Sequence, residues 1–153
     1  MSSLRIFLLF SLVIACSDDI APPIESGDSQ DPYSEALEIE DASARTSRPP
    51  HSNSAAFMTL INNGNQDLVI VGVKTPRAKV AELHTMLHED GKMKMRRVER
   101  LVVPSKGELE LKPGADHLMF FDLDKAWRIG DQLQLTLLFA KHPEQVVNLE
   151  VEK

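Results

Sequence analysis

Residues 84–95 read HTMLHEDGKMKM, and they hold the clearest hairpin signal in the chain. Asp90-Gly91 suits a two-residue type I′ turn, because both central residues of that turn adopt a positive φ. A turn at this point joins two antiparallel strands and fixes their register. The register predicts these facing pairs: Glu89 with Lys92, His88 with Met93, Leu87 with Lys94, and Met86 with Met95.

One face of this predicted hairpin carries only imidazole and thioether side chains. Strand alternation places His84, Met86 and His88 on that face, and Met93 and Met95 join them from the facing strand. Three of the six methionines and two of the five histidines of the chain therefore fall on one short surface. Thioether sulfur is a poor ligand for zinc, magnesium or calcium but suits Cu(I), and imidazole also binds Cu(I).

A second segment repeats this chemistry at His117-Leu118-Met119. Residues two apart in a strand share a face, so His117 and Met119 point the same way. Each such residue taken alone also fits a simpler structural role, since methionines often fill gaps in a core. The joint pattern of a His/Met hairpin face and a separate His-x-Met segment favours a soft-metal site.

The rest of the chain from about Leu37 is typical of an all-β protein. Short runs rich in β-branched residues alternate with turn-forming segments such as Asn63-Gly64-Asn65 and Lys112-Pro113-Gly114. About nine short strands at this spacing predict an antiparallel Greek-key sandwich or small barrel. The predicted strands are 37–41, 55–62, 67–74, 79–87, 92–98, 107–112, 117–122, 132–140 and 145–151.

Length and composition limit the remaining possibilities. The chain has 153 residues, of which 42% are hydrophobic and 26% charged, as expected for one globular domain. A formal net charge of −6 argues against a nucleic-acid partner. The chain lacks a run of about 18 apolar residues, so the sequence predicts no transmembrane helix.

The N-terminal residues predict export and lipidation. Residues 1–15 place Arg5 before a short apolar run, the pattern of a signal peptide. The run ends in Val-Ile-Ala-Cys, which resembles a bacterial lipobox and implies cleavage before Cys16 and its lipidation; the alternative is ordinary cleavage nearby. We expect residues 16–35 to be the lipidated Cys with a disordered tether, and 36–153 to be the folded domain. The expected location is periplasmic, lipid-anchored in the cell envelope, with the outer membrane favoured by Ser17.

The spacing of the His and Met residues resembles a known family. His84, ten residues, Met95, twenty-one residues, His117 and Met119 reproduce the signature of the periplasmic copper chaperones of the PCu(A)C type, which are cupredoxin-like β-barrels. The flanking segments are similar as well, among them AAFMTLINNG (55–64), LKPGADHLMF (111–120) and GDQLQLTLLF (130–139). The resemblance covers about 115 residues.

The resemblance implies a copper chaperone. It implies that His84, Met95, His117 and Met119 bind one Cu(I). Met86 faces Met95 in the hairpin register and is a candidate auxiliary ligand. It also implies delivery to a cuproprotein, typically the binuclear copper centre in cytochrome c oxidase subunit II, together with Sco-type proteins.

Three other functions compete with this interpretation. A copper-buffering or resistance lipoprotein would use the same four ligands, and a metal-free β-sandwich interaction module would use the methionines as core. A blue-copper electron-transfer protein needs a Cys thiolate beside its histidines, and Cys16 is the only cysteine. We expect no enzyme, because the chain has no Cys nucleophile in the domain, no G-x-S-x-G and no zincin motif.

Overall fold

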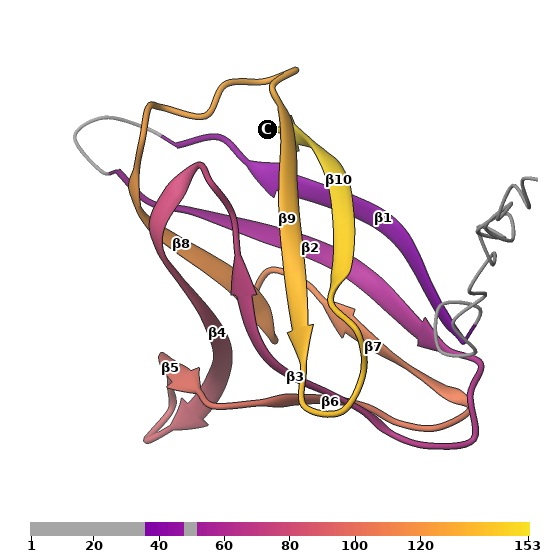
Figure 1. Ribbon diagram of the computed structural model, residues 1–153. Helices are drawn as coiled ribbons and strands as arrows, with labels where there is room; N and C mark the ends of the chain where they lie inside the picture. The colour runs from indigo at the N-terminus through magenta and orange to yellow at the C-terminus, as the bar shows by residue number, and fades with distance from the viewer. Residues whose placement is uncertain (1–35, 48–51) are drawn as a thin grey trace, which may run out of the picture.

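The computed structural model describes residues 36–47 and 52–153, and the described part is built from ten β-strands (Figure 1). The signal peptide, Cys16 and the tether predicted from the sequence lie outside the described residues. Within them, no helix is long and apolar enough to cross a membrane. The strands are β1 (Leu37–Arg45), β2 (Ser54–Asn62), β3 (Leu68–Lys74), β4 (Ala78–Glu89), β5 (Lys92–Val98), β6 (Leu101–Val103), β7 (Gly107–Leu111), β8 (His117–Leu123), β9 (Gln132–Phe139) and β10 (Gln145–Glu152).

The strands form one continuous sheet in the order β5-β4-β8-β2-β1-β10-β9-β3-β6. Strand β7 lies off this path and pairs with the second half of β2, while β8 pairs with the first half of β2. The sheet curls on itself, so that β9 and β10 cross in front of β1 and β2 (Figure 1). The all-β fold predicted from the sequence is confirmed.

Two details of the structure add to the predicted fold. The structure has ten strands, one more than the nine predicted ranges. The additional strand, β6, is only three residues long and ends before Pro104, so it is too short to show the alternation of apolar and polar residues that marks a strand. The sheet is not wholly antiparallel, since β1 and β10 pair in parallel. Parallel pairing needs no local turn, so the terminal strands leave no sequence signal for it.

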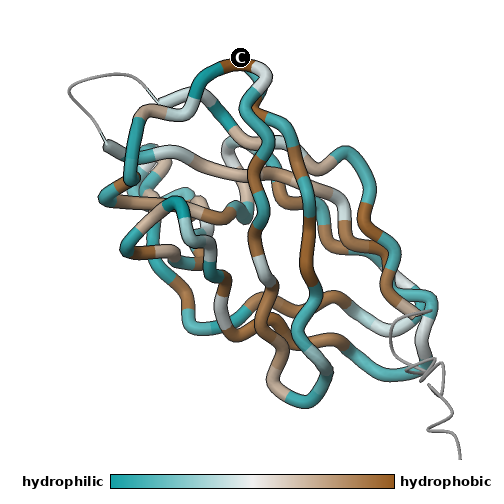
Figure 2. The backbone as a smooth tube through the Cα atoms, turned by 45° about the horizontal axis from the view of Figure 1, so that its top comes forward, coloured by the Kyte–Doolittle hydropathy of each residue, from teal (hydrophilic) through white to brown (hydrophobic). Residues whose placement is uncertain are grey.

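Hydrophobic and hydrophilic residues alternate along the strands (Figure 2), and the buried apolar side chains form one core cluster. In β2 every second residue is buried, from Ser54 to Asn62. The largest fully buried side chains are Trp127 and Phe120, whose ring centroids lie 5.3 Å apart. Since the core uses only one face of each strand, the opposite face of β4, β8 and β2 is available for other groups.

The β4–β5 hairpin has the predicted turn and register. Asp90 and Gly91 have φ values of 52° and 73°, as a type I′ turn requires. Met86 pairs with Met95 and His88 with Met93, and the other two predicted pairs also form. The His/Met face predicted from the sequence is therefore present in the structure.

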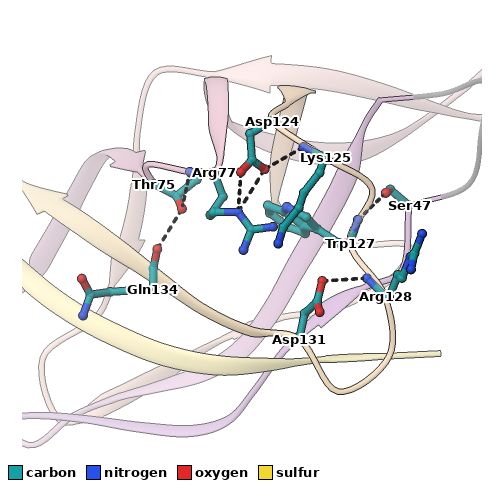
Figure 3. A network of polar contacts seen from close by, with 9 residues as sticks. All are labelled: Ser47, Thr75, Arg77, Asp124, Lys125, Trp127, Arg128, Asp131 and Gln134. Carbon is teal, nitrogen blue, oxygen red and sulfur yellow. Dashed lines mark hydrogen bonds and ion pairs between the residues drawn. The ribbon is translucent and has the colours of Figure 1, made fainter.

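A network of polar contacts joins the segment between β8 and β9 to the chain before β4 (Figure 3). The Nε–H of Arg77 donates to both carboxylate oxygens of Asp124, at 2.9 and 2.8 Å. The backbone N–H of Trp127 donates to Ser47 Oγ at 2.8 Å. These contacts hold Trp127 over the core at one end of the barrel.

We predict that Asp124→Asn lowers the melting temperature at pH 7 and has little effect in strong acid. The hydrogen bond from Arg77, followed by that from the Lys125 backbone N–H, holds the pKa of Asp124 below its ordinary value of 3.8. A carboxyl group with a lowered pKa stabilises the fold above its unfolded pKa, and this contribution is lost as the pH falls through the folded pKa. Thermal unfolding of both proteins at pH 7 and below about pH 3 measures the difference.

The matched control is Asp122→Asn, two residues away on the same strand end. Asp122 has a φ of 52°, which Asn tolerates, so this change keeps the backbone conformation. An Asp124→Asn difference that stays the same in acid would contradict the assigned role of the Arg77 ion pair.

Candidate metal centre

The predicted ligands lie on the outer face of β4, β5 and β8, on the other side of the sheet from the core. His84 on β4 and His117 on β8 are direct cross-strand partners. Strand β8 alternates between the two faces, because Leu118 and Phe120 enter the core while His117 and Met119 point to the outer face. The same local sequence thus builds the core and the site.

His117 is buried, with 5% of its surface exposed, and both of its ring nitrogens have a neighbour. Nδ1 lies 2.9 Å from the backbone carbonyl oxygen of Ala115, which can only accept, so Nδ1 carries the hydrogen. In the neutral ring Nε2 then keeps its lone pair, and it lies 3.2 Å from Met95 Sδ. A bare imidazole nitrogen beside a thioether is a pair of soft-metal ligands.

His84 is also buried, at 7% exposed, and its ring is held by a carboxylate. Its Nε2 lies 2.8 Å from Glu82 Oε2, so Nε2–H donates and Nδ1 keeps the lone pair. Nδ1 is buried and has no hydrogen-bond partner. The other carboxylate oxygen of Glu82, Oε1, lies 3.2 Å from Nη1 of Arg97. Histidines that bind metals usually donate their other N–H to a carboxylate or carbonyl, as both histidines do here.

The sequence prediction missed Glu82, Arg97 and the Ala115 carbonyl. Glu82 precedes His84 by two residues, and Arg97 faces His84 across the β4–β5 ladder. Alternation alone therefore offered a signal for Glu82. The Ala115 carbonyl offered none, because it depends on the bend of the chain before β8.

The two methionines of the predicted set lie beside His117. Met119 is the next outward residue of β8, and Met95 reaches His117 from β5 with 44% of its surface exposed. Both line a cleft of about 620 Å³, together with His117 and Met86. Three of the four predicted ligands, His117, Met95 and Met119, therefore meet at this cleft, and Met86 joins them. His84 does not line the cleft; its ring lies beside that of His117, with 5.8 Å between the centroids.

Aromatic rings surround the two imidazoles. The Phe121 ring centroid lies 6.0 Å from that of His84, and the Phe57 centroid lies 6.5 Å from that of His117. The two imidazole centroids are 5.8 Å apart. Arg45 covers the outer side of Phe57 at 5.8 Å from the ring centroid. These rings limit the access of water to the imidazole nitrogens from the strand side.

The basic residues of β5 do not line this cleft. Lys94 and Arg96 alternate with Met93 and Met95, so they point to the other face of the hairpin. Both contact Glu89, at 3.1 and 3.2 Å. These two cationic side chains therefore do not border the cleft.

Thioethers complete the donor set at this site. Within the described ranges 36–47 and 52–153, no three or more His, Cys, Asp and Glu side chains are grouped to hold a metal ion. The two imidazoles and two thioethers match the preferences of Cu(I) instead. The fold is that of a cupredoxin-like domain, and its His and Met side chains form a candidate soft-metal site.

The chain belongs to the family described as "Putative lipoprotein LpqE-like", which matches residues 37–151 and is part of the PCu(A)C copper chaperone group. The chain is 30% identical to Cu(I)-bound DR1885 from Deinococcus radiodurans, with a TM-score of 0.62, covering 82% of this chain and 85% of that one. It also shares the fold of the copper-bound PCuAC domain of PmoF2, at 20% identity and a TM-score of 0.65, over 76% of this chain and 92% of that one.

A curated relative shows similar identity over a shorter part. The chain is 30% identical over 101 residues to the uncharacterized protein RP573 of Rickettsia prowazekii. The match covers 65% of this chain and 56% of the length of that protein.

Proposed function

We propose that the protein is an extracytoplasmic copper chaperone that binds one Cu(I) through His84, Met95, His117 and Met119. The observation that carries this proposal is the bare Nε2 of buried His117, which lies 3.2 Å from the thioether of Met95. The unpartnered Nδ1 of His84 supplies a second imidazole nitrogen. The Cu(I)-bound relative from Deinococcus radiodurans, at 30% identity, supports the choice of metal.

Two neutral imidazoles and two thioethers leave the bound ion with its single positive charge. Thioethers bind Cu(I) less firmly than thiolates, and Met95 is nearly half exposed, so an incoming ligand can displace it. A site built in this way favours transfer over permanent storage. We therefore prefer a chaperone to a copper-buffering or resistance lipoprotein, and we assign no catalytic step.

The recipient in this proposal is an extracytoplasmic cuproprotein, the binuclear copper centre of cytochrome c oxidase subunit II, with Sco-type proteins as further partners. Lipidation of Cys16 and a tether over residues 17–35 would hold the domain at the cell envelope, with the outer membrane favoured. The cleft is much larger than one metal ion, and this leaves room for a loop of the recipient. Arg45 and Lys153 also line the cleft and favour an acidic recipient surface.

The test is an anaerobic Cu(I) titration of the whole chain against a chromophoric chelator, followed by mixing with a copper-free oxidase subunit II domain. We expect one tightly bound ion and its transfer to the recipient. Tight binding without transfer would support the buffering alternative. Absence of Cu(I) binding would support the metal-free interaction module.

A further inference from the structure

The two histidines of the proposed centre are poorly accessible. Only 7% of His84 and 5% of His117 is exposed, and Phe57 and Phe121 lie beside them. A copper ion arrives on another protein and exchanges ligands one at a time. The first ligand to meet it must therefore be exposed. Neither histidine of the centre fulfils this condition, whereas Met95 and the outer part of its hairpin do.

An exposed His/Met pair lies at the tip of the β4–β5 hairpin. His88 and Met93 face each other across the ladder, and His88 Nδ1 lies 3.3 Å from Met93 Sδ. Both side chains are exposed, Met93 to 50%. Metal bonds to imidazole nitrogen and to sulfur are roughly 2.0–2.3 Å long, so one ion can contact both atoms. We call His88 and Met93 the tip pair.

Further soft ligands follow the tip pair on the same face. Met86 and Met95 are the next outward pair, two residues along each strand, or about 7 Å away. Met95 Sδ in turn lies 3.2 Å from the bare nitrogen of His117. Imidazoles and thioethers thus follow one another at intervals along this face, from the hairpin turn, at the lower left in Figure 1, to the buried histidines.

Near the tip pair, the cationic side chains of β5 lie on the other face of the hairpin. Arg97 shares the face of the methionines, but it lies opposite His84, at the far end from the turn, and contacts Glu82 at 3.2 Å. Lys92, Lys94 and Arg96 alternate with the methionines of β5 and lie on the other face of the hairpin. Glu89, which contacts both Lys94 and Arg96, lies on that face as well. Between the turn and the Met86–Met95 pair, this face therefore presents neutral ligands to an approaching cation.

We infer that His88 and Met93 form a second, weaker Cu(I) site through which copper enters and leaves the buried centre. This inference rests on the proposed function. The ion passes from the tip pair to Met86 and Met95 and then to His117, and at each step one copper–ligand bond forms before another breaks. The metal stays Cu(I) throughout, so no electron or proton has to be supplied.

The test compares the whole chain with its His88→Asn/Met93→Leu variant. Leucine keeps the volume of methionine without its sulfur, and both positions are exposed, so the fold is retained. We expect the wild type to bind a second, weaker Cu(I), and the variant to lose it while its tight site changes by less than about threefold. Release of the tightly bound ion to an excess of chromophoric chelator, followed by stopped flow, should slow by about tenfold in the variant.

The matched control is Leu87→Ala, an exposed residue of the same hairpin on the opposite face. Its release rate should equal that of the wild type. In the wild type, a second equivalent of redox-silent Ag(I) should also shift the NMR signal of the Met93 methyl group, an effect that a purely structural role would not produce.

A variant that releases copper at the wild-type rate and still binds the second ion would overturn the tip site. That result would not affect the proposal of the buried centre, because the tightly bound first Cu(I) is measured separately. A wild type that binds no Cu(I) at all would instead reject the proposed function and the tip site together.

Discussion

Replacing His117 by Ala should raise the dissociation constant for the tightly bound Cu(I) by at least about 100-fold, because even residues that only orient ligands commonly contribute 10–100-fold. His117 supplies the bare Nε2 beside Met95 and packs against His84, so its loss removes a ligand and opens the centre to water. An anaerobic competition titration with a chromophoric chelator measures the change.

Methionine-to-leucine changes test the contribution of the sulfur atom to Cu(I) binding separately from the contribution of the side chain to packing. Met95→Leu and Met119→Leu conserve volume, so each should weaken Cu(I) binding by about tenfold while the melting temperature stays close to that of the wild type. His142→Ala provides the histidine control, since His142 lies between β9 and β10, outside the cleft that contains His117. Retention of tight binding in His117→Ala would show that the ligand spacing is coincidental.

The hairpin was predictable because its information is local. Asp90-Gly91 fixes the turn, the turn fixes the register, and alternation then determines which side chains share a face. The structure reproduces every predicted pair between Glu89–Lys92 and Met86–Met95. The ligand set on this hairpin could therefore be read from the sequence once the turn was recognised.

Contacts between strands distant in sequence were less predictable. Direct pairing of His84 with His117 depends on β4 lying beside β8, and no turn joins these strands. The parallel pairing of β1 with β10 depends in the same way on closure of the whole sheet. The spacing shared with the family predicted that the two histidines belong to one site. Hydrophobic periodicity alone predicted only which face of its own strand each histidine occupies.

The roles of the orienting groups and the burial of the site were the least accessible to sequence reasoning. Alternation places Glu82 on the face of His84, but only the structure shows that Glu82 accepts the N–H of His84 and contacts Arg97. Met95 is nearly half exposed while both histidines are buried, and this difference depends on Phe57, Phe121 and the bend before β8. The site therefore consists of predictable ligands in a setting that only the tertiary structure supplies.

The second large effect that we expect is a loss of folding stability in Phe120→Ala, because Phe120 belongs to the core beneath the candidate site. Phe120 is fully buried, its ring lies 5.3 Å from that of Trp127, and it neighbours Met119 in β8. Truncating a buried Phe typically costs about 3–5 kcal/mol, a large part of the roughly 5–15 kcal/mol that stabilises a domain. Urea unfolding followed by Trp127 fluorescence measures the loss.

Phe121→Ala is the matched control for Phe120→Ala, because the two rings are adjacent in β8 and lie on opposite faces of the sheet. Phe121 is only partly buried and packs against His84, so its loss should cost less stability and should weaken Cu(I) binding instead. Phe120→Ala should show the reverse, with a large fall in stability and near-normal Cu(I) affinity in the folded fraction. Equal stability losses in the two variants would contradict the assignment of one face of β8 to the core and the other to the metal.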